Sequence, residues 1–399
     1  MKHSKKRIDF LRLKASYRNK IIALVIAISV FGVGFAIIRS GAAGFLFATE
    51  AEQGAVSDSA VVLNDPTASG GKAIQFKAAP TTPPPTTPPP VGLKGWQINP
   101  TNVGLAPHGL SCASLPEYNG PVSNGNFKPA AGSVISKVRI SKPMNLSNGN
   151  ITIEKSCIRG GGIINEQGMT VTWEPDGCGN SCTPGRGPVT IRDSEFDGSN
   201  IGREAVSRGC AFHGLGFLER NYIHDLGSGL CFVNTGKELS GSMVNNYIHK
   251  LRGNGIDPGT PQGSHNEAGT IRDFPTNSNP NRTILIANNM FDSKDTGDND
   301  SGAFFIQPIW GEINNATLEG NLFVSGNFNL TLEAYNRDGE RIPYGRNMRA
   351  NNNRFDGGYY GPHNNQQNGV VNYGWAEAKE NYINDPSKPD NKGRALSLD

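Results

Sequence analysis

Apolar residues beyond position 92 come in short runs separated by glycine and asparagine, without the spacing of a long amphipathic helix. One phrase recurs eight times in these runs: a serine or asparagine, any residue, and then isoleucine or phenylalanine. Its apolar residues are Ile158, Phe196, Ile223, Ile248, Phe291, Phe323, Phe355 and Ile383, at intervals of 25 to 43 residues. Its polar residues are Ser156, Ser194, Asn221, Asn246, Asn289, Asn321, Asn353 and Asn381. Such an internal repeat indicates stacked units.

The repeat predicts an all-β fold, a right-handed parallel β-helix over residues 92–399. Each coil would stack on the last at about 4.8 Å and bury its apolar residue in one continuous core. The variable intervals are expected if insertions fall in loops. Asparagine suits the bend because it tolerates left-handed backbone and because its amide can bond to the asparagines above and below. We therefore expect a ladder of asparagines.

The residue after each apolar anchor should point out of the core. In four consecutive units these residues are Asp197, His224, His249 and Asp292, which would form a polar row if the coils stack in register. Such a row could bind a divalent metal or orient a general base. It could also be a solvated face with favourable cross-strand pairs, and the sequence leaves both interpretations open.

Residues from about 97 to 385 resemble the bacterial pectin-lyase-like, right-handed parallel β-helix surface proteins. The matching pieces are NPTNVGL (99–105), AAGSVISKVRI (130–140), NITIEKSCI (150–158), VTIRDSEFDG (189–198) and the repeated NYIH at 221–224 and 246–249. The resemblance implies the fold. It does not select an activity, because this fold hosts lyases, glycosidases, phage tailspikes and non-enzymatic adhesins.

In the resembled enzymes the substrate groove lies along one sheet, whose outward residues act on the substrate. Alternation from the inward Ile256, Ile271, Ile306 and Leu332 places Asp257, Arg272, Gln307 and Glu333 on the outside. The long insertion between two anchors would overhang this sheet with His265, Glu267 and Asp273. The candidate catalytic residues are therefore Asp257, Arg272, Glu333, His265 and Glu267.

Two reactions suit this set of residues. In β-elimination from a uronate, calcium held by carboxylates neutralises the acid group of the substrate, and Arg272 would remove the α-proton. In glycoside hydrolysis, two carboxyl groups flank the bond, and Asp257 with Glu333 would be that pair. The sequence does not decide between the two reactions.

An acidic loop covers residues 292–300, where Asp292, Asp295, Asp298 and Asp300 surround a glycine. Closely spaced carboxylates at a turn can wrap Ca²⁺. The spacing is not that of an EF-hand, so an ordinary acidic loop is the alternative to a calcium site.

Several aromatic residues in the C-terminal part could stack on sugar rings. They are Tyr359, Tyr360, Trp310, Tyr335 and Trp375. The alternative is that these rings cap the end of the β-helix or fill its loops.

The N-terminus has the pattern of a membrane anchor. Residues 1–20 contain eight lysines or arginines and one acid, and residues 21–38 are uncharged and long enough to span about 27 Å as a helix. This predicts a cytoplasmic segment at 1–20, a single transmembrane helix at 21–38 and an extracellular remainder. A cleaved signal peptide, processed near Gly41 and Ala43, is the alternative.

Charge is unevenly distributed along the chain. The whole chain has a net charge of +3, but the part beyond Arg39 has a net charge of −5. A nucleic-acid partner needs clustered cations, so the acidic main body argues against one.

All six cysteines lie on the predicted extracellular side, where disulfides persist. We expect Cys178 to pair with Cys182 and Cys210 to pair with Cys231. A zinc site at CGNSC (178–182) is the alternative for the first pair.

Two segments separate the anchor from the repeat. Residues 45–79 resemble the opening of jelly-roll carbohydrate-binding modules, through Glu50-Ala51-Glu52 and the stretch from Ala68 to Lys72. In that family the first acidic residues help to bind a structural calcium. Only about thirty residues match, so we interpret the segment as a truncated module or a short strand pair. The proline- and threonine-rich residues 80–91 predict a polyproline spacer of about 34 Å.

Together these features predict a membrane-anchored extracellular protein whose partner is a polysaccharide or another cell-surface glycan. It would cleave this partner as a polysaccharide lyase or glycoside hydrolase, with Ca²⁺ as a candidate cofactor. The alternative is a non-catalytic adhesin, carbohydrate-binding protein or structural stalk on the same fold.

Overall fold

The computed structural model describes most of the repeat region. Side chains are described for residues 93–165, 187–202, 209–253, 266–294, 301–309, 311–333, 347–364 and 375–398, and the backbone alone for strand residues 60–64, 72–76, 300, 366–367 and 370–371.

The chain divides into two compact units, residues 1–86 and 87–399. In the first unit, β1 (Ala60–Asn64) and β2 (Lys72–Phe76) form an antiparallel pair. The predicted transmembrane segment 21–38 lies outside the described residues. None of the helices that are described is long and apolar enough to cross a membrane.

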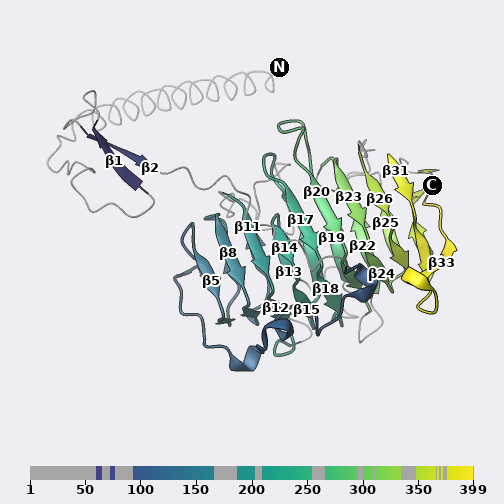
Figure 1. The fold of residues 1–399 in the computed structure, drawn as a ribbon, viewed down its shortest axis with the longest axis horizontal. Helices are drawn as coiled ribbons and strands as arrows, with labels where there is room; N and C mark the ends of the chain where they lie inside the picture. The colour runs from purple at the N-terminus through teal and green to yellow at the C-terminus, as the bar shows by residue number, and fades with distance from the viewer. Residues whose placement is uncertain are drawn as a thin grey trace, which may run out of the picture. The chain divides into compact units, whose positions relative to one another are not determined.

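The second unit consists mainly of three long sheets (Figure 1). Sheet 1 contains β3 (Val122–Ser123), β4 (Asn126–Phe127), β7 (Met144–Asn145), β10 (Ile163–Asn165), β13 (Cys210–Gly214), β16 (Ser228–Phe232), β19 (Asn266–Ile271), β22 (Asp300–Ile306), β25 (Phe328–Leu332) and β28 (Gly361–Asn364). Sheet 2 contains β5 (Val134–Ser136), β8 (Ile151–Glu154), β11 (Val189–Arg192), β14 (Phe217–Glu219), β17 (Gly241–Val244), β20 (Ile284–Ala287), β23 (Ala316–Glu319), β26 (Arg349–Asn351) and β31 (Glu377–Lys379). Sheet 3 contains β6 (Arg139–Ile140), β9 (Cys157–Ile158), β12 (Glu195–Asp197), β15 (Tyr222–His224), β18 (Tyr247–His249), β21 (Met290–Asp292), β24 (Leu322–Val324), β27 (Arg354–Phe355), β32 (Tyr382–Asn384) and β33 (Lys392–Ala395).

From β4 to β28 each sheet takes every third strand, so one passage through the three sheets makes a coil, and successive coils pair in parallel. Only the first pair of sheet 1, β3 with β4, and the last pair of sheet 3, β32 with β33, are antiparallel within these sheets. A separate antiparallel pair joins β29 (Gln366–Gln367) to β30 (Val370–Val371). This all-β arrangement is consistent with the predicted parallel β-helix.

The apolar anchors of the repeat stack in one row of sheet 3. Strand pairing aligns all eight of them, from Ile158 to Ile383, each against the anchor of the next coil. The rings of Phe291 and Phe323 stack in the core with their centroids 5.7 Å apart. The repeat read from the sequence is therefore the register of the coils.

The polar residues of the repeat form the predicted ladder. From Asn246 to Asn381, each side-chain oxygen accepts hydrogen bonds of 2.9 to 3.1 Å from the backbone N–H and the amide of the asparagine one coil earlier. Each amide also donates to a backbone carbonyl of the preceding coil, as Asn321 does to Ile286 at 2.8 Å. Ser194 extends the ladder through its backbone N–H, which donates to Asn221.

The left-handed backbone of each bend belongs to the residue before the ladder, not to the ladder residue itself. Asn245 and Asn288, for example, have φ values of 56° and 55°. Our expectation that the ladder asparagines would take this conformation is therefore wrong. Two neighbouring residues therefore share the bend. The first takes the left-handed backbone, and the second points its side-chain amide along the stack of coils.

Residues 93–118 form a strap that runs along the outside of the coils. The strap contains three short 3-10 turns, η3 (Gly95–Gln97), η4 (Ala106–His108) and η5 (Cys112–Ser114). It contacts successively earlier coils: Trp96 packs under Arg354, Gly95 bonds to Gly320, Gly104 to Arg220, His108 to Asp193 and Glu117 to Arg139. The strap thus ties together coils from one end of the fold to the other.

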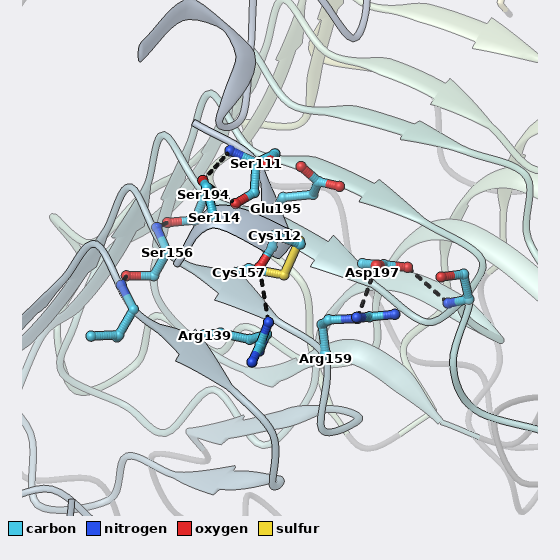
Figure 2. The surroundings of a disulfide bond; sticks show 12 residues. Ser111, Cys112, Ser114, Arg139, Ser156, Cys157, Arg159, Ser194, Glu195 and Asp197 are labelled. Carbon is cyan, nitrogen blue, oxygen red and sulfur yellow. Dashed lines mark hydrogen bonds and ion pairs between the residues drawn. A yellow bond between two sulfur atoms is a disulfide. The ribbon is translucent and has the colours of Figure 1, made fainter. Parts of the chain in front are cut away.

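Close packing and a disulfide fix the strap in place. A side chain at Gly95 would clash with the backbone of Asn289 and Leu322, so this position requires glycine. Ile98 and Val103 pack on Tyr247, and Cys112 is bonded to Cys157 of β9 (Figure 2). As a result, the strap covers the outward tyrosines of sheet 3.

The C-terminal end of the core is closed by two aromatic side chains. His363 pairs in register with the buried Leu330 and lies 6.5 Å from the ring of Trp375. The ring nitrogens His363 Nε2 and Trp375 Nε1 are buried without a hydrogen-bond partner in the described structure. Burial lowers the pKa of His363 to about 4. The coil end is therefore held by a neutral imidazole.

We predict that Asn321→Ala lowers the free energy of unfolding by about 3 kcal/mol or more, because it leaves buried donors and acceptors in neighbouring coils without partners. Denaturant unfolding measures this loss. The exposed Asn277→Ala is the control and should change stability by less than about 0.5 kcal/mol. Equal stability of the two variants would contradict a stabilising ladder.

We also predict that His363 makes the fold sensitive to acid. The unfolded imidazole has a pKa near 6.5 and the folded one about 4, so the unfolded chain binds the extra proton between these values. Stability is then fully present above pH 6.5 and falls by about 3 kcal/mol in total as the pH drops to 4. His363→Gln should remove this part of the pH dependence in unfolding curves; a profile as steep as that of the wild type would refute it.

Candidate functional site

The outer face of sheet 1 brings together a row of polar residues from three successive coils. Ile271, Ile306 and Leu332 pair in register, so the residues that follow them, Arg272, Gln307 and Glu333, lie side by side. The backbone N–H groups of Gln307 and Glu333 bond to the carbonyls of Ile271 and Ile306, both at 2.9 Å. At the usual strand spacing, the backbones of Arg272 and Glu333 are about 10 Å apart.

Glu267, at the opposite end of β19, reaches this row through Arg272. The guanidinium Nη2 donates to Oε2 of Glu267 at 3.1 Å and to Oε1 at 3.4 Å. The Glu267 side chain is 7% exposed and that of Arg272 26%. A buried carboxylate needs such a partner, since an unpaired charge would be strongly destabilising.

Glu333 lies in the electrostatic field of this pair. Burial raises the pKa of Glu333, a hydrogen bond from Gln307 and the charge of Arg272 lower it, and the charge of Glu267 raises it. The net effect is a pKa above the usual range of a glutamate. The cluster of Glu267, Arg272, Gln307 and Glu333, called here the sheet 1 cluster, therefore holds one carboxyl group biased towards its protonated form beside one paired carboxylate.

This arrangement suits acid–base chemistry. A carboxyl group with a raised pKa can donate a proton to a leaving group, while a neighbouring carboxylate stabilises positive charge, attacks, or activates water. Arg272 fits less well as a base, because its guanidinium already donates its protons to Glu267. Its geometry suits a positioning role.

The other residues predicted for this face either lie elsewhere in the structure or are not among the described residues. Asp257 and His265 fall outside the described residues. Asp273 is fully buried, and its carboxylate accepts the backbone N–H of Thr235 at 3.1 Å. Its charge acts on the buried Arg282, which donates to four backbone carbonyls. The expectation that Glu267 and Asp273 overhang the sheet as an exposed rim is therefore wrong, because Glu267 is part of β19 and both residues are buried.

The predicted polar row is present on sheet 3. Asp197 pairs with His224 and His224 with His249, and Asp292 follows in the next coil. The row is not a continuous chain of contacts. His249 Nδ1 contacts Asp292 at 2.7 Å, whereas Asp197 is paired with Arg159 at 3.1 Å (Figure 2).

His224 is the more enclosed of the two histidines in this row, with a side chain that is 12% exposed against 28% for His249. Its Nε2 lies 3.1 Å from Glu195 and its Nδ1 lies 2.7 Å from Asp225, and its ring stacks on Tyr222 at 4.3 Å. Burial lowers the pKa of His224, but the hydrogen bonds to Glu195 and Asp225 outweigh burial, and the net effect is a raised pKa. A histidine held between two carboxylates is stabilised as a cation.

One group on sheet 3 has the geometry for a metal ion. Potential ligand atoms of Asp197, His224 and Asp225 all lie within 4.8 Å of one another. Cys112 and Cys157 also lie near Asp197, but they are joined in a disulfide and offer no thiolate. The hydrogen bonds to both nitrogens of His224 favour a charge network over a metal site, because a metal ligand must be a neutral imidazole.

The predicted calcium loop is described only at its start. The two carboxylate oxygens of Asp292 are occupied, one by His249 and the other by the backbone N–H of Lys294 at 2.9 Å. Asp295 and Asp298 lie outside the described residues, and Asp300 is described as backbone in β22. Calcium binding by this loop stays a prediction.

The disulfides follow the sequence expectation in one case. Cys210 is bonded to Cys231, as predicted, and joins β13 to β16 on neighbouring coils. The pair Cys112 and Cys157 was not predicted, because the strap that carries Cys112 has no repeat phrase. Cys178 and Cys182 lie outside the described residues.

The aromatic residues separate into two kinds. Trp375 is 9% exposed and fills the end of the core, as the capping interpretation expects. Tyr359 and Tyr360 are 81% and 68% exposed. Trp310 and Tyr335 lie outside the described residues.

Sequence reasoning missed the partners that surround the predicted residues. Glu195, the middle residue of its repeat phrase, could have been found by strand alternation from Phe196. Asp225 lies two residues after Ile223, where a left-handed backbone (φ 55°) interrupts the alternation. The coverage of Tyr222 and Tyr247 by the strap had no signal in the sequence.

Comparisons of the chain with protein-family models, with curated proteins and with solved structures found no match.

We predict that His224 titrates above the ordinary range of histidine and that Asp225→Asn lowers its pKa, because a cation-stabilising hydrogen bond is lost. With a raised pKa, protonated His224 stabilises the fold below about pH 6.5, and this contribution disappears as the pH rises. NMR titration of the imidazole protons measures the pKa of His224 in the wild type and in the variant. An unchanged pKa of His224 in the variant would show that Asp225 does not stabilise the protonated imidazole.

Proposed function

We propose that this protein is a cell-surface glycoside hydrolase on a right-handed, pectin-lyase-like β-helix, tethered to the cell membrane by residues 21–38. Its substrate would be a polysaccharide bound along the outer face of sheet 1. Right-handedness is supported by the strong general preference of parallel strand crossovers. The tether is supported by the apolar length and the basic flank of the N-terminal segment.

The observation that carries the proposal is the sheet 1 cluster. Glycoside hydrolysis needs one carboxyl group that gives a proton and a second, ionised carboxylate, and their environments must differ. Glu333 has a raised pKa, and Glu267 is paired with Arg272. We assign proton donation to Glu333 and the nucleophile or base role to Glu267.

Arg272 controls access to Glu267 in this proposal. Because the Glu267 side chain is 7% exposed, substrate binding must draw Arg272 away from it or insert a hydroxyl group between them. Elimination from a uronate is less well supported, because it would assign the role of base to Arg272.

The strap covers part of the outer face of sheet 3, and this favours sheet 1 as the surface that binds the substrate. On sheet 3 the strap packs Ile98 and Val103 against Tyr247, and Tyr222 lies beside them. A polymer could reach the outer row of this sheet only beside the strap. Sheet 1 carries no such strap among the described residues.

A non-catalytic glycan-binding protein is the second candidate. The burial of Glu267 and its ion pair with Arg272 favour it, because the same pair can serve to fix the outer face of sheet 1. Binding without cleavage would then be the function of the surface.

We predict that the full chain in detergent releases reducing ends from a polysaccharide, without the absorbance of unsaturated products and without a need for calcium. Glu333→Gln and Glu267→Gln should each lower the rate by about 100-fold or more, because acid–base groups typically contribute factors of this size. The exposed Glu319→Gln on sheet 2 is the matched control and should retain full activity.

If unsaturated products formed and their formation depended on calcium, the reaction would be elimination and the proposed hydrolysis would be wrong. If uronate and neutral polysaccharides were retained by the protein but none was cleaved, the binding function would replace the enzymatic one.

A further inference from the structure

Two neighbouring aromatic rings stand in solvent at the turn between β27 and β28. Tyr359 is 81% exposed and Tyr360 68%, and they are the only aromatic residues among the exposed large hydrophobic side chains of the described structure. Their rings meet edge to face with centroids 4.7 Å apart, and Tyr360 continues to Phe328 at 5.9 Å. The three rings form a connected aromatic surface, called here the tyrosine platform.

The platform is held by a rigid turn. The backbone N–H groups of Tyr359 and Tyr360 donate to the carbonyls of Gly326 and Asn327 at 2.8 and 2.7 Å. Asp356 accepts from Ser325 N–H, from the Asn329 amide and from Gly358 N–H. A surface that is ordered before binding loses little entropy when a ligand arrives.

The platform has no structural task that explains its exposure. The core end is closed by Trp375 and His363 instead. Exposed aromatic surface on a fixed turn is characteristic of a binding site. A tyrosine offers an apolar ring face together with a polar hydroxyl, which matches a pyranose ring with its C–H face and its hydroxyl edge.

The charged residues in the segments that form the platform favour a neutral sugar chain over a uronate chain. Residues 325–329 and 356–364 contain no lysine or arginine, and Asp356 is their one acidic residue. Within these two segments a uronate chain would meet no counter-charge and one like charge. A neutral sugar chain has no such cost.

The position of the platform connects it to the sheet 1 cluster. Phe328 begins β25, and Glu333 follows directly after the end of the same strand. Five residues of extended strand span about 17 Å, so the platform and Glu333 lie at the two ends of β25.

We propose that the tyrosine platform binds the pyranose rings of a neutral polysaccharide by stacking on Tyr359 and Tyr360. This inference rests on the proposed function for the further step that the bound chain continues to Glu333. The stacking itself is independent of whether the chain is cleaved.

The test is affinity electrophoresis of the full chain, in non-ionic detergent, through gels that contain hydroxyethyl cellulose, xylan or polygalacturonate. We expect a neutral polymer to retard the wild type and polygalacturonate to leave its mobility unchanged. Each tyrosine-to-alanine change should weaken binding about two- to tenfold, because an aromatic contact contributes that much. Y359F with Y360F should bind like the wild type, since both rings remain.

Leu285→Ala is the control for loss of an exposed apolar side chain away from the platform, and it should bind like the wild type. Unchanged thermal unfolding of the alanine variants shows that the fold is intact, as expected for side chains so exposed.

Equal retardation of wild type and of the double alanine variant would overturn the platform, and so would a wild type that neither neutral polymer retards. Stronger retardation by polygalacturonate would overturn the assignment to neutral sugars. Retardation that depends on the tyrosines, without release of reducing ends, would support the platform and overturn the proposed hydrolysis.

Discussion

The register between coils is the constraint on which the rest of this structure depends, and the asparagine ladder maintains it. Every ladder asparagine is fully or almost fully buried, and from Asn221 to Asn353 its side chain bonds to the coils on either side. A coil that slipped by one residue would lose these bonds and would turn its core residues outward. Because buried polar groups without partners are so costly, the ladder penalises every alternative register.

A fixed register turns sequence positions into surface rows. On sheet 1 it sets Arg272, Gln307 and Glu333 on three adjoining coils, and on sheet 3 it sets Asp197, His224 and His249 in line. The two rows differ in what surrounds them. On sheet 3, His224 is held between the carboxylates of Glu195 and Asp225 beside the strap. On sheet 1, Glu333 has a raised pKa in the sheet 1 cluster. For this reason we assign the proposed chemistry to sheet 1.

The sequence was sufficient to predict the coils, because each repeat phrase contains both the residue that enters the core and the residue that joins the ladder. It was also sufficient to place Arg272, Gln307 and Glu333 in one row, since strand alternation and register determine outward neighbours. It could not predict that Asp273 is buried, because its carboxylate is bonded to Thr235, which belongs to an earlier coil. Nor could it predict the strap or the Cys112–Cys157 bond, since residues 93–118 carry no repeat and their path is determined by contacts with distant coils.

The most direct test of the account is a crystal structure of the Glu333→Gln variant with a bound neutral oligosaccharide. The account predicts that sugar rings lie on Tyr359 and Tyr360 and that the chain follows β25, with a glycosidic oxygen within hydrogen-bond reach of the side chain at position 333. An oligosaccharide bound instead on sheet 3, beside His224 and the strap, would contradict the assignment of function to sheet 1.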